Sequence, residues 1–184
     1  MDASEAAGLV ASTVASGETW ADLGAGSGTF TAALARLVGR EGRVYAVERE
    51  PRALGALGAL AQRQSRDDAP ISVVHADFTQ RLDLPLLDGV LLANSLHFVA
   101  EDEQSPLLRR LAAFLSAQGA LVIVEYDNRP RSPWVPFPVS LARLGDLARE
   151  AAFATPMVVG RRASDYGGTM YVARLDRPAT SSRA

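Results

Sequence analysis

Several polar side chains with chemical potential stand directly after short apolar runs of the sequence. The first group lies in a glycine-rich loop and consists of Asp22, Gly24, Ala25 and Gly26. The later groups are Glu48 with Arg49, Asp77 with Phe78, Asn94 with His97, and Asp127 with Asn128. Carboxylates and amides accept hydrogen bonds from a ligand, and a histidine can take up a proton near neutral pH. These residues are therefore the first candidates for a binding site and for catalysis.

The glycine-rich loop restricts the kind of ligand most strongly. A dinucleotide-binding loop has the pattern G-x-G-x-x-G, whose glycines let the backbone approach a pyrophosphate. Here Gly24 and Gly26 fill the first two positions, but Thr29 stands at the third. Asp22 would also place a negative charge beside a pyrophosphate bound at the following helix. The loop therefore favours a ligand with an ammonium group, such as the methionine end of S-adenosylmethionine (SAM).

The next two groups fit the remainder of such a ligand. Glu48 lies about 20 residues beyond the loop, where an acidic residue can accept hydrogen bonds from both ribose hydroxyls. Asp77 can accept a hydrogen bond from an adenine amino group, and Phe78 can pack on the adenine ring. These residues therefore predict a ligand that contains adenosine. Because NAD and SAM both contain this ribose, Glu48 does not distinguish between the two ligands.

The composition excludes several other chemistries. Among the 184 residues there is no Cys, and all 19 basic residues are Arg. Cysteine nucleophiles, thiolate metal sites, Walker lysines and Schiff-base lysines are therefore excluded. A net charge of −2 does not indicate broad nucleic-acid binding. The apolar runs are shorter than the ~20 residues that span a bilayer, and the start of the chain is acidic, so we expect a cytoplasmic protein without a membrane partner.

Apolar periodicity predicts the elements that position these side chains. Strands are predicted over residues 19–24, 42–48, 71–77, 89–95, 120–126, 155–160 and 169–175, and helices over 29–38, 51–61, 103–116 and 139–151. This alternation predicts an α/β fold, namely a Rossmann-like, doubly wound, seven-stranded and mostly parallel sheet with a C-terminal antiparallel β-hairpin. We expect one domain over residues 1–175 and a flexible tail over 176–184. The candidate residues then meet beyond the carboxyl ends of the strands.

The ordered motifs also carry a family resemblance. "ADLGAGSGTF", "VYAVE", "HADF", "LLANSLHF" and "LVIVEYD" resemble the successive motifs of class I SAM-dependent methyltransferases, over residues 19–175. "AAFATPMVV" is similar to the end of small-molecule members, including those of quinone biosynthesis. The resemblance implies SAM as the donor and S-adenosylhomocysteine (SAH) as its product. It assigns the methionine part to Asp22, Gly24 and Gly26, the ribose to Glu48, and the adenine to Asp77 and Phe78. Ala25, Arg49 and Asn94 are further candidates for binding the donor.

The residue types and motifs that are absent from the sequence exclude several classes of methyl acceptor. Without Cys and Lys, pyrimidine methylation through a cysteine adduct and lysine-dependent ribose methylation are excluded. The sequence "NSLH" also differs from the N-P-P-[YF] motif of enzymes that methylate exocyclic amines of bases. A small-molecule acceptor is therefore predicted, and nucleic acid is disfavoured. One alternative is a protein that binds SAM without catalysis, and a more distant one is a nicotinamide-dependent oxidoreductase. The sequence does not predict the oligomeric state, and a homodimer is one of the options.

His97 is the candidate catalytic base, because it follows the fourth predicted strand and imidazole titrates near neutral pH. The alternative is a histidine that only packs. Asp127 and Asn128 resemble the Mg²⁺ ligands of catechol-type methyltransferases. No further Asp occurs after the fourth strand until Asp102, so no metal is predicted.

The segment 127–138 contains four prolines, at positions 130, 133, 136 and 138, which exclude an ordinary helix interior. Its place after the fifth strand predicts an acceptor-binding lid, with Arg129, Arg131, Trp134 and Phe137 available to a substrate. The alternative is a stiff connector whose tryptophan fills core.

Overall fold

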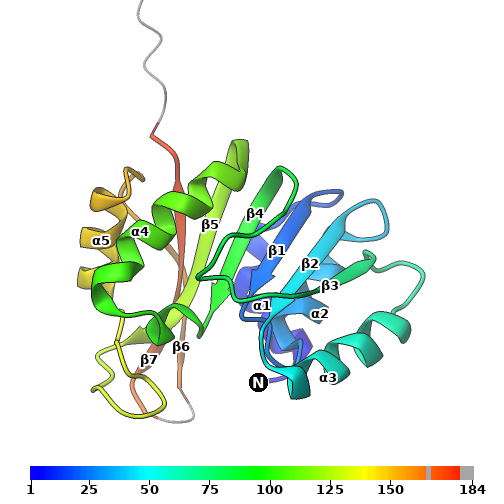
Figure 1. Ribbon diagram of the computed structural model, residues 1–184, viewed down its shortest axis with the longest axis horizontal. Coiled ribbons are helices and arrows are strands. Elements are labelled where there is room, and N and C mark those ends of the chain that lie inside the picture. Colours follow the sequence, from blue (N-terminus) through cyan, green and yellow to red (C-terminus); the bar gives the residue numbers. More distant parts are fainter. Residues whose placement is uncertain (165–166, 179–184) are drawn as a thin grey trace, which may run out of the picture.

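The centre of the protein is one mixed sheet of seven strands (Figure 1). The computed structural model describes residues 1–164 and 167–178. The strand order is β3-β2-β1-β4-β5-β7-β6. The first five strands run parallel, and β7 is antiparallel to both β5 and β6. The predicted Rossmann-like sheet with antiparallel strands at its C-terminal end is thereby confirmed.

The elements alternate along the chain much as the periodicity predicts. The strands are β1 Thr19–Leu23, β2 Arg43–Glu48, β3 Ile71–His75, β4 Leu87–Ala93, β5 Leu115–Asp127, β6 Met157–Ala163 and β7 Thr169–Asp176. The helices are α1 Ala3–Val10, α2 Thr29–Val38, α3 Pro51–Gln62, α4 Glu101–Leu111 and α5 Leu141–Glu150, with short 3₁₀ turns η1 Ala11–Thr13, η2 Leu96–Phe98 and η3 Ala112–Phe114. No helix in the described ranges is both long and apolar enough to cross a membrane.

Several element boundaries differ from the prediction. The helix expected over 103–116 ends at Leu111, because Leu115 already pairs with Leu87 as the first residue of β5. At the other end of the chain, β7 extends through Asp176, one residue into the predicted tail. Residues 179–184 of that tail lie outside the described residues.

Helix α1 is the element that the sequence pattern did not predict. Asp2 caps its N-terminus by accepting hydrogen bonds from the backbone N–H groups of Ser4 and Glu5. The Glu5 carboxylate in turn accepts from the backbone N–H of Asp2, which completes a capping box. The spacing of this acid pair at the start of the chain was the available signal for the helix.

Helices cover both faces of the sheet, and the alternation of side chains along the strands builds a core on each. On one face, Leu92 of β4 packs in a cluster with Leu108 of α4 and Leu144 of α5. On the other, the neighbouring Leu91 joins Leu34 of α2 and residues of α1. Figure 1 shows α4 in front of β5 and β7, with α1 and α2 behind the sheet. The strand order reverses between β1 and β4, which is where open α/β sheets bind ligands.

Gly89 tests the packing of this central strand pair. It pairs with Trp20 across β1 and β4, and a Cβ at position 89 would overlap the indole ring. We expect Gly89→Ala to lower the free energy of unfolding by about 1–3 kcal/mol, as overpacked cores do. Urea unfolding measures this loss. The matched control is Gly55→Ala in α3, where a Cβ meets open space, and which should gain about 0.5–1 kcal/mol. An unchanged midpoint for Gly89→Ala would contradict the packing described.

Candidate active site

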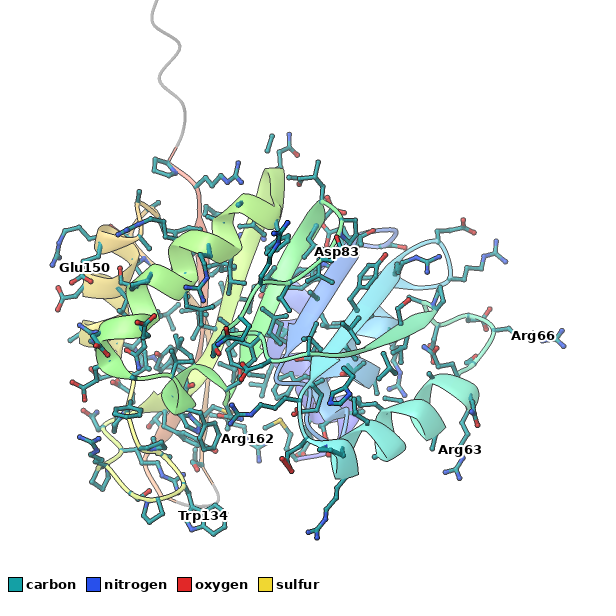
Figure 2. The ribbon with its side chains drawn as sticks, viewed as in Figure 1. Arg63, Arg66, Asp83, Trp134, Glu150 and Arg162 are labelled. Carbon is teal, nitrogen blue, oxygen red and sulfur yellow. The ribbon has the colours of Figure 1, made fainter. Side chains whose placement is uncertain are left out.

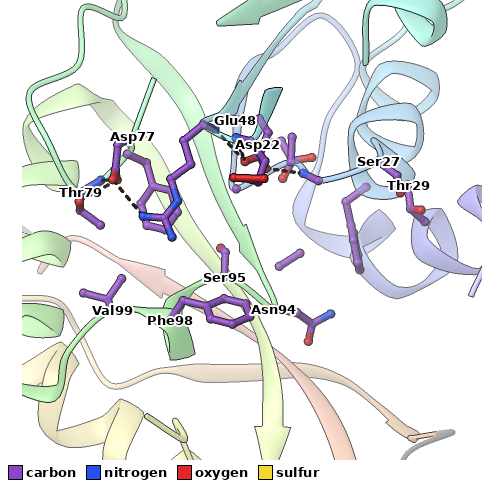
Figure 3. Close-up of a pocket in the computed structure, with 18 of the residues that line it drawn as sticks. Asp22, Ser27, Thr29, Glu48, Asp77, Thr79, Asn94, Ser95, Phe98 and Val99 are labelled. Atoms are coloured by element: carbon purple, nitrogen blue, oxygen red, sulfur yellow. Dashed lines mark hydrogen bonds and ion pairs between the residues drawn. The ribbon is translucent and has the colours of Figure 1, made fainter. Parts of the chain in front are cut away.

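A pocket of about 530 Å³ opens where β1, β2 and β4 end (Figure 3). It is lined by all nine residues that the sequence predicts for donor binding, namely Asp22, Gly24, Ala25, Gly26, Glu48, Arg49, Asp77, Phe78 and Asn94. The strand ends therefore bring these residues to one place. Other lining residues were not predicted, among them Met1, Ser27, Thr29, Phe30, Thr79, Ser95, Phe98 and Val99. Most of these residues lie within a few positions of a predicted donor-binding residue. Their position near a strand end could therefore have identified them from the sequence.

Asp22 is a buried carboxylate at the floor of this pocket. Its Oδ2 accepts a hydrogen bond of 2.6 Å from the Thr31 hydroxyl, whereas Oδ1 has no partner among the described residues. Burial raises the pKa of Asp22 from its ordinary 3.8 to about 6; the Thr31 hydrogen bonds oppose this rise and the charge of Glu48 adds to it. A buried acceptor oxygen without a partner is costly, and a cationic donor group from a ligand would remove that cost.

Glu48 is fixed at the end of β2 by backbone N–H groups. Its Oε1 accepts from the backbone of Arg49 at 2.7 Å and of Glu50 at 2.8 Å. Its Oε2 accepts from the backbone of Gly26 at 2.8 Å (Figure 3). Glu48 therefore also ties the glycine-rich loop to β2, a structural task that the sequence pattern did not reveal.

Asp77 terminates β3 through a local turn. Its Oδ1 accepts from the backbone and the hydroxyl of Thr79, at 2.9 and 2.7 Å, so the strand ends at His75 and not at residue 77 as predicted. Its Oδ2 lies 3.1 Å from the guanidinium of Arg49. Partial burial raises the pKa of Asp77, but the hydrogen bonds from Thr79 and Arg49 outweigh it and hold the pKa below its ordinary value. Asp77 is therefore ionised at neutral pH.

Asn94 follows β4 in a left-handed conformation, with φ of 54°. This conformation ends the strand at Ala93, earlier than predicted, and asparagine tolerates it better than most residues. The neighbouring Ser95 donates to the carbonyl of Leu23 at 2.7 Å, which brings the two strand ends together. The contact leaves no room for a side chain on the loop, because a Cβ at Gly24 would lie 2.7 Å from that of Ser95.

The amide oxygen of Asn94 adds a second orphan acceptor to the pocket. Oδ1 is buried and has no hydrogen-bond partner among the described residues, as is the case for Oδ1 of Asp22. Two such atoms in one pocket indicate that it is built for a ligand with hydrogen-bond donors.

His97 does not line this pocket but a second one, of about 440 Å³, that shares Asn94 and Phe98 with the first. The other described lining residues are Tyr126, Arg129, Trp134 and Val135. His97 is 2% exposed, and its Nδ1 lies 2.7 Å from Oε2 of Glu125. The backbone N–H of His97 donates to Oε1 of the same carboxylate at 3.0 Å. If Nδ1 carries the proton that it shares with Glu125, Nε2 is the ring atom able to accept one.

Glu125 is a candidate functional residue that sequence reasoning missed. It is fully buried in β5, between apolar neighbours. A buried carboxylate needs a partner, and its partner here is His97. The signal was the acidic residue within "LVIVEYD", whose other residues up to that point are apolar.

The proline-containing segment contributes two of its four candidate residues to the second pocket. Arg129 and Trp134 line it, whereas Arg131 and Phe137 are not among its described lining residues. The guanidinium of Arg131 instead stacks on the ring of Phe137, 4.7 Å from the centroid. The backbone N–H of Phe137 donates to the carbonyl of His97 at 3.0 Å. The segment is thus anchored on the turn that carries the candidate base.

Asp127, the residue that raised the possibility of Mg²⁺, has structural partners. Its Oδ1 accepts from the backbone of Leu141 at the start of α5, and its Oδ2 lies 3.7 Å from the guanidinium of Arg161. Within the described ranges, no group of three or more His, Asp or Glu is arranged to hold a metal ion. Asp127 therefore ties the first residue of α5 to the end of β5, and metal independence stays a prediction.

Comparison with protein families gives one match. Residues 21–119 match a family model described as a methyltransferase domain, which is more than half of the chain. A search of the curated proteins found no match.

Solved structures of several methyltransferases share this fold. CcbJ from Streptomyces caelestis has a TM-score of 0.76 and 20% identity, over 97% of this chain and 90% of that one. The Burkholderia thailandensis 1,6-didemethyltoxoflavin-N1-methyltransferase, solved with its substrate and SAH, has a TM-score of 0.75 and 23% identity, over 95% and 77%. The mitomycin 7-O-methyltransferase MmcR has a TM-score of 0.69 and 19% identity, over 95% of this chain but 53% of its own length. The chain thus spans about half of that enzyme. At these identities, the likeness concerns the fold.

Proposed function

The chain belongs to the methyltransferase domain family, and we propose that it transfers a methyl group from SAM to a small-molecule acceptor. One observation carries the choice of donor. The buried Asp22, whose Oδ1 lacks a partner among the described residues, lies in the pocket that gathers all nine predicted donor-binding residues. An ammonium group, as on the methionine end of SAM, is the ligand group that satisfies such a carboxylate.

The other pocket residues fit the remaining parts of SAM. Glu48 lies at the end of β2, where it can accept from the ribose hydroxyls in addition to its backbone bonds. Asp77 is ionised and can accept from the adenine amino group, with Phe78 beside the ring. Asn94 belongs to both pockets, so we place it next to the methyl group that passes between them.

The transfer itself requires positioning more than acid–base chemistry. The acceptor atom forms a bond to the methyl carbon while the carbon–sulfur bond breaks, and its electron pair stays on sulfur, which leaves SAH as a neutral thioether. Holding the two reactants in line can supply about 7–11 kcal/mol of the barrier reduction. A proton acceptor is needed only when the acceptor atom carries a hydrogen.

We assign that proton acceptor to His97. Its ring lines the second pocket, and the contact with Glu125 fixes the ring orientation and favours a proton on Nδ1. Nε2 then takes the proton of the acceptor, and the buried Glu125 carboxylate stabilises the imidazolium that forms. The donor thus occupies the first pocket and the acceptor the second, with the methyl group between them near Asn94 and Phe98.

A small-molecule acceptor is supported by the size of the second pocket, about 440 Å³, which lies in the range of small-ligand sites. The Burkholderia thailandensis enzyme, which shares the fold, acts on 1,6-didemethyltoxoflavin, also a small molecule. The finer predictions are a quinone-type acceptor, a cytoplasmic location and independence from metal.

Titration calorimetry with SAM, SAH and NAD tests the donor assignment. We expect SAM and SAH each to bind at one site per chain and NAD not to bind, because a pyrophosphate would meet the charge of Asp22. Binding of NAD without SAH would overturn the proposal.

Release of SAH from SAM in a panel of small acceptors then tests catalysis. Tight SAM binding without release from any acceptor would favour the alternative of a non-catalytic SAM-binding protein.

A further inference from the structure

We infer that the second pocket accepts an aromatic molecule that presents an ionisable hydroxyl to His97 and an anionic group, such as a carboxylate, to Arg129. This inference rests on the proposed function, because it names the acceptor class for the same site. It is carried by three observations: the aromatic walls of the pocket, the guanidinium of Arg129 among its lining residues, and the buried His97–Glu125 pair.

Aromatic side chains form the walls of the pocket. Phe98 and Trp134 both line it, although 52% of the phenylalanine and 78% of the tryptophan are exposed. Large exposed aromatic residues of this kind commonly mark a binding surface. Trp134 projects from the loop after β5, at the edge of the molecule (Figure 2). Tyr126, at the end of β5, completes the set. A planar ring can stack between such side chains, whereas a flexible aliphatic molecule would make weaker contacts with them.

Arg129 and His97 both lie beside the ring of Tyr126. The guanidinium of Arg129 lies 4.5 Å above the Tyr126 ring. The ring of His97 lies 6.2 Å from the same ring, centroid to centroid. Arg129 is the one permanently charged side chain among the described lining residues. A single aromatic ring packed against Tyr126 can therefore reach the base with one substituent and the guanidinium with another.

The chemistry at the base favours a hydroxyl with an acidic proton. The hydroxyl oxygen bonds to the methyl carbon of SAM, its proton moves to Nε2 of His97, and the carbon–sulfur electron pair stays on sulfur. A phenolic hydroxyl loses its proton far more readily than an aliphatic one, because the ring delocalises the negative charge. An imidazole base can therefore assist the methylation of a phenolic hydroxyl but is a poor match for an aliphatic one.

Three matched probes test the inference on the protein saturated with SAH. The first is 4-hydroxybenzoate, the second is its methyl ester, which keeps ring and hydroxyl but loses the charge, and the third is 4-hydroxycyclohexanecarboxylate, which keeps charge and hydroxyl but loses aromaticity. We expect calorimetry to give an affinity about five- to tenfold higher for 4-hydroxybenzoate than for either analogue, as an ionic or cation–π contact contributes at a partly exposed site.

Two variants of Arg129 locate the charge effect. Arg129→Met should abolish the preference for the acid over the ester, and Arg129→Lys should keep it. The matched control is Arg131→Met, in the same segment but stacked on Phe137 and not among the described lining residues, which should leave the preference unchanged. Equal affinity for acid and ester, equal affinity for the aromatic and cyclohexane acids, or an equal effect of Arg131→Met would each overturn the inference. If SAH itself fails to bind, the proposed function fails; if SAH binds and the preference is missing, only the inference fails.

Discussion

Replacing His97 by glutamine is expected to lower kcat by about 10²- to 10⁴-fold with an acceptor that must lose a proton, the range typical of a missing general base. Glutamine can still donate a hydrogen bond to Glu125, so the buried carboxylate keeps a partner. Alanine is the poorer choice, because an unpaired buried charge costs about 3–5 kcal/mol and would mix stability with catalysis. The affinity for SAH, measured by calorimetry, should not change, because His97 lies outside the donor pocket.

Glu125→Gln separates positioning from proton transfer. The glutamine side chain in Glu125→Gln can still orient the imidazole, but it does not neutralise the imidazolium, so kcat should fall while KM for the acceptor stays the same. A His97→Gln enzyme with the kcat of the natural protein would show that this histidine only packs.

Asp22→Asn is expected to stabilise the unliganded protein and to weaken donor binding. Because burial raises the pKa of Asp22 to about 6, the folded state holds this proton more tightly than the unfolded chain does. The resulting stabilisation is complete below about pH 4 and is lost as pH rises through about 6. At pH 7 the natural protein therefore carries a buried charge that asparagine avoids. At about 1.36 kcal/mol per pKa unit, the variant should gain up to about 3 kcal/mol in the free energy of unfolding.

Donor binding should move in the opposite direction. Loss of the charge facing an ammonium group should lower the affinity for SAH about 10- to 100-fold, the equivalent of one hydrogen bond to a charged group. In the natural protein the SAH affinity should rise from pH 5 to pH 7, as Asp22 ionises, and in Asp22→Asn that rise should disappear. Calorimetry at several pH values and urea unfolding at pH 5 and pH 8 measure both effects. If Asp22→Asn bound SAH with unchanged affinity, the ammonium group of the ligand would not contact Asp22.

Local patterns were sufficient to predict most of the sheet and one helix in full. Helix α2 spans the predicted residues 29–38, because Gly28 and Gly39, both with positive φ, bound it. The methyltransferase resemblance and the Rossmann-like sheet are also confirmed. These features depend on periodicity and on glycines that a single chain displays directly.

Tertiary pairing accounts for most of what was missed. The extension of β5 back to Leu115 depends on its partner Leu87, 28 residues earlier in the chain, which local propensity does not reveal. The pairing of His97 with Glu125 likewise joins two elements that are separate in sequence. The donor-binding and catalytic roles of the candidate residues stay predictions, although the structure brings their side chains to two adjoining pockets.

The hydrogen bond that anchors the proline-containing segment on His97 has a consequence for the evolution of this protein. The described residues of the donor pocket all precede position 100, and the family match ends at 119, whereas Tyr126, Arg129 and Trp134 come later in the chain. With the pocket roles proposed above, codon changes within 129–135 are expected to alter the acceptor while the donor contacts stay intact. The hydrogen bond from the backbone N–H of Phe137 to the carbonyl of His97 uses main-chain atoms only, so the candidate base keeps its place as residues 129–135 diverge. A randomised library confined to this short stretch is accordingly the natural starting point for directed evolution of new acceptors.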